Sequence, residues 1–292
     1  MKTIQRIAKN IFALIKQTLT AWQTDKASRL AAALAYYAIF SLAPLLMIVI
    51  AIIALVFGER AARNEIAGQL QALVGPDAAG MIQTMIANLN NRTSGILATI
   101  IGTLTIVLGA SGLFGQLQSA LDTIWHVPPP EKGNFVKVLK EWLMHFAMVL
   151  GVGALLLLSL LSGIAATAIT NYFNVGNILH IVNISTSLFL TTLLFAIIYK
   201  ALPTVKIAWW DVWIGATVTA ILFTLGKLLI DVYMANSSIG SAYGAAGSLV
   251  VLLVWVYYSA QIFLLGAEFT HAYTQIFGSM RETNILNSQT DE

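Results

Sequence analysis

Long runs of apolar residues, separated by short polar stretches, dominate this chain. Six of them are long enough to cross a lipid bilayer, which takes roughly 20 mostly apolar residues in a helix. They cover residues 30–57, 95–121, 142–169, 178–199, 212–234 and 249–269. The pattern predicts an all-α, polytopic membrane protein with six transmembrane helices, which together form one domain over 25–275.

Residues 1–24 have a different pattern, in which apolar and basic positions alternate at helical spacing. Ile4, Ile7, Ile11 and Leu14 share one face, and the basic residues share another. This is typical of an amphipathic helix that lies in the membrane interface and is attracted by anionic lipid. A cytoplasmic helix that packs on the transmembrane bundle fits the same pattern equally well.

Residues 59–94 form the only sizeable external region that the predicted topology contains. Two amphipathic stripes flank the dipeptide Gly75–Pro76, which predicts a break between two short external helices. At the other end, residues 276–292 are polar, and we expect a flexible tail there.

The composition places most of the chain in hydrocarbon. Hydrophobic residues make up 58% of the chain and charged residues only 10%, whereas soluble domains carry about 25% charged residues. Mean hydropathy is +0.79. The formal net charge of +3 is too small and dispersed to favour nucleic-acid binding. The absence of cysteine excludes disulfides and thiol chemistry. We expect no cleavable signal peptide.

The distribution of lysine and arginine predicts the orientation of the helices. Twelve of these residues fall in the two terminal segments and the even-numbered loops, and three fall in the first loop. Because positive loops stay on the inner side, both termini are expected in the cytoplasm.

Two opposite charges interrupt the fifth apolar run. Lys227 and Asp231 are four residues apart, so they can pair on one side of a helix. A lone charge in hydrocarbon costs about 2.5–3.5 kcal/mol, and pairing offsets part of this cost. The pair is either a structural contact between helices or the lining of a cavity in which Lys227 attracts an anionic group.

The sixth run has a polar stripe at helical spacing that contains Tyr257, Gln261 and Glu268. Glu268 is expected near the cytoplasmic end. One interpretation is that it anchors the helix by pairing with Lys26 or Arg29. The alternative is a protonatable carboxyl group that binds a coupling ion or gates the inner mouth of a cavity.

The second run ends with Gln118 and Asp122 on one face. Asp122 also falls near the cytoplasmic side, where it is expected to share a water-filled vestibule with Glu268. Both side chains are therefore candidate cavity-lining residues.

The remaining candidates are two tyrosines and three residues that affect the backbone. Tyr36 and Tyr37 bring hydroxyl groups into the first run and could line a cavity. Pro44 removes a backbone donor and is expected to kink the first helix. Gly244 and Gly247 lie in a loop of small residues that fits a hinge or a close-packed turn.

Five stretches carry a resemblance to a known family. They are RLAAALAYYAIFSLAPLL (29–46), SGLFGQLQSALDTIW (111–125), ALPTVKIAWWDVWIGA (201–216), FTLGKLLIDVY (223–233) and SAYGAAGSLVVLLVWVYYSAQIFLLGAEFTHAY (241–273). With them the chain, over about residues 10–275, closely resembles the YihY/BrkB family of bacterial inner-membrane proteins. The resemblance implies six helices and a link to serum resistance, a virulence property, and to movement of envelope lipids. An earlier ribonuclease label of the family is regarded as a misassignment.

Three classes of function can be compared. An enzyme is disfavoured, since the chain has no HExxH, phosphate-loop or GxSxG motif, and no cofactor or metal is expected. The favoured function is transport of an amphipathic, anionic lipid or envelope precursor through a polar cavity between helices. The alternatives are an ion-coupled exporter or antiporter of a small solute, driven by protons or sodium, and a membrane scaffold. Membrane lipids are the expected partners, nucleic acid is not, and the sequence does not indicate an oligomeric state.

Overall fold

The fold is entirely helical wherever the structure describes it. This computed structural model describes residues 2–90, 112–128, 143–155, 157–158, 161–162, 176–236, 243 and 246–280. Every regular element within these ranges is a helix, and no strand occurs there. The predicted all-α class is therefore confirmed. Gly244 and residues 281–292 of the predicted tail lie outside the described residues.

Within the described residues, four helices are long and apolar enough to cross a membrane. They are α2 (Ala27–Phe57), α7 (Gly176–Ala201), α8 (Trp209–Asn236) and α10 (Gly247–Ile276). They match the first, fourth, fifth and sixth predicted spans. The second span is described only as a helix over 112–124, and the third begins as the apolar helix Leu143–Leu155. The total of six spans therefore remains a prediction.

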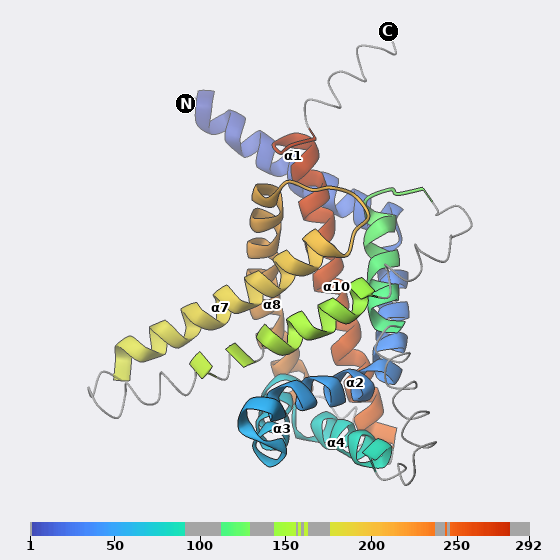
Figure 1. The fold of residues 1–292 in the computed structure, drawn as a ribbon. Helices are drawn as coiled ribbons and strands as arrows, with labels where there is room; N and C mark the ends of the chain where they lie inside the picture. Colours follow the sequence, from blue (N-terminus) through green and yellow to red (C-terminus); the bar gives the residue numbers. More distant parts are fainter. Residues whose placement is uncertain are drawn as a thin grey trace.

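The first helix and the last turns of the final helix lie at the same end of the bundle, which we call the terminal end (Figure 1). Helix α1 (Lys2–Thr24) lies there beside the last turns of α10 and packs on both α10 and α2. Lys26 has φ 54°, so a left-handed residue separates α1 from α2. Ala27 and Ala31 follow it with no exposed surface, and such small side chains let the start of α2 pack closely.

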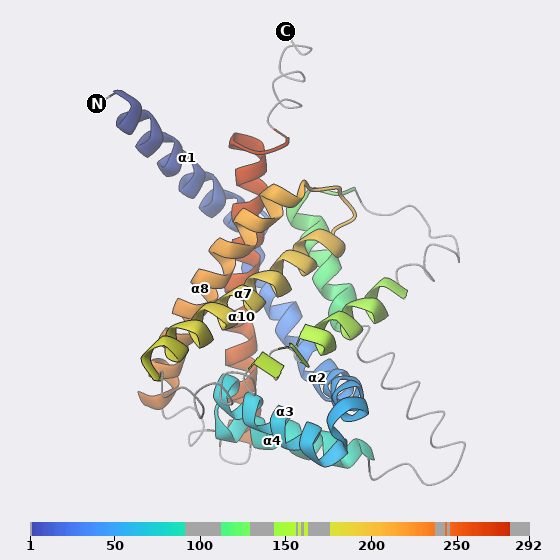
Figure 2. The same cartoon turned by 60° about the vertical axis from the view of Figure 1, so that its left-hand side comes forward.

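Helices α3 (Glu59–Val74) and α4 (Pro76–Asn90) form the opposite end, which we call the α3–α4 end (Figures 1 and 2). Gly75 separates them with φ 84°, a conformation that favours glycine. The break therefore occurs at the expected dipeptide. Ile66 of α3 and Ile82 of α4 are buried in one apolar cluster with Ile53 of α2 and Leu252 of α10. This cluster joins α3 and α4 to α2 and α10.

Helices α8 and α10 pack closely because glycines of each helix face side chains of the other. A Cβ atom on Gly215 would overlap the side chain of Thr270, and one on Gly266 would overlap Thr219. Tyr199 of α7 closes the same contact. Its hydroxyl donates to the Phe263 carbonyl at 2.7 Å and lies 3.1 Å from Thr219 Oγ1. Small residues at such crossings are typical of helix packing in membranes.

Candidate functional site: a polar cluster at the terminal end

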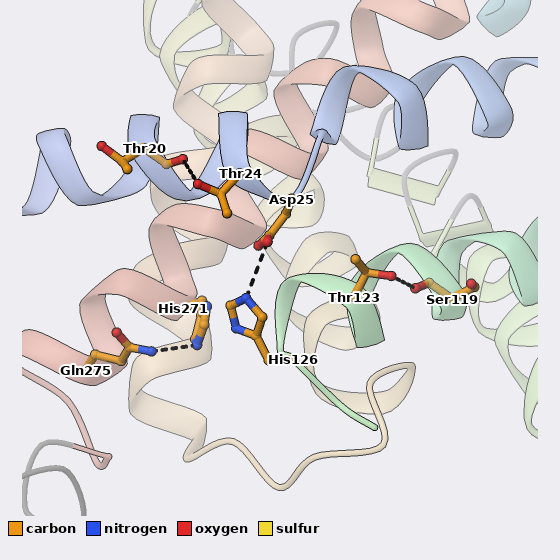
Figure 3. A network of polar contacts seen from close by, with 8 residues as sticks. All are labelled: Thr20, Thr24, Asp25, Ser119, Thr123, His126, His271 and Gln275. Carbon is orange, nitrogen blue, oxygen red and sulfur yellow. Dashed lines mark hydrogen bonds and ion pairs between the residues drawn. The ribbon is translucent and has the colours of Figure 1, made fainter. Parts of the chain in front are cut away.

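A cluster of polar side chains from distant parts of the chain lies at the terminal end. Asp25, in the turn between α1 and α2, has its Oδ1 3.3 Å from His126 Nε2, across 101 positions of sequence (Figure 3). The Asp25 side chain is only 8% exposed, whereas that of His126 is 62% exposed. The pair therefore connects the interior of the bundle to its surface.

The turn after the helix over 112–124 positions His126. Its backbone has φ 52°, and the N–H groups of His126 and Val127 donate to the carbonyls of Thr123 and Asp122 at 3.0 and 2.9 Å. Trp125, just before it, is 7% exposed and belongs to the main apolar core. The buried tryptophan and the closed turn together direct the His126 ring toward Asp25.

His271 of α10 lies in the same cluster, and its ring centroid is 4.8 Å from that of Trp125 and 5.3 Å from that of His126. Gln17 donates through Nε2 to Gln275 Oε1 at 2.7 Å, and Gln275 Nε2 lies 2.8 Å from His271 Nε2. Because Gln275 Oε1 accepts from Gln17, the amide nitrogen Nε2 of Gln275 faces His271. An amide nitrogen only donates, so His271 Nε2 accepts this hydrogen bond. This arrangement corresponds to a neutral His271 ring.

Glu268, one turn before His271 on α10, is the most deeply buried ionisable residue in this cluster. It has no exposed surface, and neither carboxyl oxygen has a hydrogen-bond partner in the described part of the chain. The second oxygen of Asp25, Oδ2, is also buried without a partner. The two carboxyl groups interact electrostatically. Two acidic groups from different elements therefore share one buried site.

An open groove of about 440 Å³ runs along α1 beside this cluster. Asp25 and His126 form one end of it, and Lys16 supplies a cation. The other lining residues are small or uncharged, and they are Ala13, Gln17, Thr20, Ala21 and Thr24. The groove thus combines mainly apolar walls with a few polar groups, which suits an amphipathic molecule.

The opposite side of α1 is apolar and exposed. Ile11, Phe12, Ile15 and Leu19 have between 49% and 70% of their surface exposed. Leu14 and Thr18, on a third side, are buried. Helix α1 therefore packs on the bundle and also presents an apolar face, so the two interpretations of its sequence are compatible.

The predicted pair of Lys227 and Asp231 forms an ion pair, with Nζ and Oδ2 3.0 Å apart. The side chains are 32% and 46% exposed, on a part of α8 whose neighbours Leu228, Leu229 and Val232 are also exposed. The structure thus brings these two residues to each other and not to the cluster of Asp25 and Glu268. Whether they line a cavity remains a prediction.

Asp122 and Gln118 have structural partners. Asp122 Oδ1 accepts from the Thr204 N–H at 2.9 Å and from its hydroxyl at 3.1 Å, which fixes the loop after α7. This contact differs from the vestibule with Glu268 that the sequence suggested. Gln118 is buried, and its Oε1 lies 2.8 Å from His145 Nε2 on the helix Leu143–Leu155.

The other candidates on α10 and α2 are not part of the cluster. Tyr257 is half-buried against the main core. Gln261 is half-buried, with a buried Oε1 that has no partner among the described residues. Tyr36 and Tyr37 are exposed and stack edge-to-face with each other at 5.7 Å.

Pro44 and Gly247 have backbone roles. Pro44 is buried inside α2, which continues through it without a break. Gly247 is the buried first residue of α10. The expected kink and hinge remain predictions.

Sequence reasoning missed Asp25 and His126 as site residues. Asp25 is the only acid in the first 58 residues, directly after an amphipathic segment, and this was the one local signal available. Glu268 was identified, but with Lys26 or Arg29 as partner. Both of those cations are exposed, and neither is bonded to Glu268. Within the described residues, no group of three or more histidine or acidic side chains could hold a metal ion.

Comparison with known proteins assigns the family. The family model described as "Virulence factor BrkB" matches residues 18–287, which is most of the chain. The chain belongs to this family. The resemblance read from the sequence is thereby confirmed, and the protein is membrane-embedded.

The curated relatives are membrane proteins named UPF0761. One from Pseudoalteromonas atlantica is 28% identical over 292 residues, covering 97% of this chain and 92% of the relative. One from Pseudomonas aeruginosa is 26% identical over 254 residues, covering 84% of this chain. The chain spans 58% of the length of that Pseudomonas relative. No solved structure matches the chain.

Proposed function

We propose that this protein moves an amphipathic, anionic lipid or envelope precursor across the bacterial inner membrane. The observation that carries the proposal is the open groove along α1. Its walls are mostly apolar, Lys16 supplies a positive charge, and the buried acidic cluster lies at one end. An acyl chain would lie along the apolar wall, while the headgroup phosphate would bind Lys16.

The proposed orientation places the terminal end in the cytoplasm. Lys26, Arg29 and Lys206 are exposed at this end, whereas Arg60 and Arg63 lie on α3 at the other end. The greater number of cations at the terminal end supports this orientation. The exposed apolar face of α1 then rests on the inner leaflet, so the groove opens where lipid headgroups are present.

Flux of labelled lipid tests the proposal. The full chain is reconstituted into liposomes that contain headgroup-labelled phosphatidylglycerol or labelled phosphatidylcholine, and an impermeant quencher reports movement between leaflets. We expect faster movement of phosphatidylglycerol than in protein-free liposomes, and little effect on phosphatidylcholine. Equal rates with and without protein would contradict lipid transport and favour a scaffold.

A matched pair of variants tests the role of the groove. Lys16→Gln removes the cation in the groove, whereas Lys9→Gln removes a cation from the same helix that does not line it. Because a hydrogen bond to a charged group contributes about 1.5–3 kcal/mol, we expect Lys16→Gln to slow phosphatidylglycerol transport by a factor of about 10 to 100. Lys9→Gln should transport like the wild type. Equal effects of both changes would mean that the groove has no special role.

A further inference from the structure

We infer that Asp25 and Glu268 form a proton-binding site, in which Glu268 carries the proton and His126 exchanges it with water. This inference goes beyond lipid transport and does not depend on it. It rests on three side chains from three parts of the fold and on the order of their exposure. Figure 3 shows Asp25, His126 and His271 of this cluster from close by.

The unpartnered oxygens are the first observation. Both oxygens of Glu268 and Oδ2 of Asp25 are buried without a hydrogen-bond partner in the described part of the chain, and the two carboxyl groups interact. Two neighbouring carboxylates cannot both be ionised in a buried site without a large cost. One shared proton removes this cost, because the protonated Glu268 can donate to Asp25 Oδ2.

The partner of the other Asp25 oxygen determines which acid carries the charge. Asp25 Oδ1 lies 3.3 Å from His126 Nε2, so it can accept from that ring nitrogen. Asp25 is therefore suited to be the ionised member, and Glu268, with no exposed surface, the neutral one. We therefore assign one shared proton to the pair, with Glu268 as its main carrier.

The exposures of the three side chains define a route for the proton. They rise from 0% for Glu268 to 8% for Asp25 and 62% for His126. The proton passes from Glu268 to Asp25 Oδ2, and the Asp25 carboxyl group rotates. The exposed His126 ring exchanges with water from the tautomer that donates through Nε2 to the neutral tautomer with its hydrogen on Nδ1, and it then takes the proton at Nε2. The net result is a Glu268 carboxylate and a His126 imidazolium, with the number of protons unchanged.

Other charged groups around the site are already bonded or face water. His271 is neutral by its hydrogen bond from Gln275. Lys26 and Arg29 are exposed. Elsewhere on the packed elements, Asp211 of α8 accepts from Ser279, Asp122 accepts from Thr204, Lys200 of α7 donates to the Ile207 carbonyl, and Lys16 lines the groove.

Infrared spectroscopy of the full chain in lipid vesicles at neutral pH tests this site. We expect an absorption band of a protonated carboxyl group in the wild type. Glu268→Gln should abolish the band, and Asp25→Asn should shift it, because the acceptor becomes an amide. Asp231→Asn, which alters the distant ion pair, should leave the band unchanged. Absence of the band in the wild type, or its persistence in Glu268→Gln, would overturn the inference.

A second measurement needs no substitution in the buried pair. Labelling all glutamates with ¹³C in the carboxyl group should move the wild-type band to lower frequency. His126→Asn should keep the band but slow its exchange after a rapid change to D₂O. Asparagine is chosen because it tolerates the positive φ of this position. A band that does not respond to glutamate labelling, or an exchange rate unaffected by His126→Asn, would contradict the assignment.

Discussion

His126 Nε2 lies 3.3 Å from Asp25 Oδ1, although 101 residues separate the two along the chain. The contact joins the turn that begins the first spanning helix to the turn that follows the helix over 112–124. It also places an exposed ring next to a buried acidic pair. This relationship explains why the groove along α1 has a polar end in a bundle that is otherwise mainly apolar.

The exposure of His126 predicts a small effect of this contact on stability. A single hydrogen bond contributes about 0.5–1.5 kcal/mol, so His126→Asn should lower the free energy of unfolding by no more than that. Unfolding by urea in detergent measures the change. A loss of several kcal/mol would show that the ring has a structural role that its exposure does not indicate.

The contact between α8 and α10 predicts a much larger effect at Gly266. A Cβ atom there would overlap Thr219 and would lie 2.7 Å from the Tyr199 hydroxyl. Because both neighbours are buried side chains in a packed core, Gly266→Ala should cost about 1–3 kcal/mol of stability.

Gly151 provides the matched control for this substitution. It lies in the helix Leu143–Leu155, and a Cβ atom there would meet nothing within 4 Å. Gly151→Ala should be neutral or stabilise the protein by up to about 1 kcal/mol through helix propensity. Thermal unfolding in detergent compares the two variants. Equal stability of both would contradict the close packing of α8 on α10.

The ion pair on α8 predicts that single and double substitutions have non-additive effects on the amount of folded protein. Lys227 and Asp231 are bonded to each other on a half-exposed part of a spanning helix. Lys227→Met alone leaves a single charge in hydrocarbon, which costs about 2.5–3.5 kcal/mol. We therefore expect less folded protein in membranes from Lys227→Met than from the double variant Lys227→Met/Asp231→Leu.

Transport by the same variants addresses the function of this pair. Normal folding and unchanged lipid transport in Lys227→Met would exclude a functional role for the lysine. If the losses of folded protein in Lys227→Met and Asp231→Leu added up to the loss in the double variant, this would contradict direct coupling between the two charges.

The exposed apolar face of α1 predicts contact with lipid tails. Phe12 is 70% exposed on that face. A tryptophan introduced by Phe12→Trp should therefore be quenched by brominated acyl chains, since such a helix buries its apolar face at the headgroup boundary. Lys9→Trp, on the basic side of the helix, is the control. To isolate the new signal, each variant is compared with the unmodified chain, and equal quenching at both positions would contradict the proposed orientation of α1.

Some features could be predicted from the sequence because local patterns determine them. An uncharged stretch of sufficient length predicts a spanning helix, and α2 and α10 follow this rule. The Gly75–Pro76 dipeptide ends one helix and begins another. The pair of Lys227 and Asp231 depends only on their spacing of four residues within one helix.

The polar cluster depends on tertiary packing and left little local signal. Asp25 comes from a turn, His126 from another turn, and Glu268 from the last span, and no sequence period relates them. Asp122 illustrates the same limit, because its partner Thr204 lies 82 residues away in a loop. The spacing of residues along the chain predicts contacts within one helix, whereas only the fold determines which side chains from distant segments lie together.

Blocking the groove along α1 tests the central claim most directly. Ala13 lines the groove, whereas Leu19 is an exposed residue of the apolar face. Both are replaced by tryptophan, and movement of labelled phosphatidylglycerol between leaflets is measured in liposomes with equal amounts of folded protein. The account predicts that Ala13→Trp abolishes protein-dependent movement while Leu19→Trp retains it. Movement at the wild-type rate in Ala13→Trp would contradict the account.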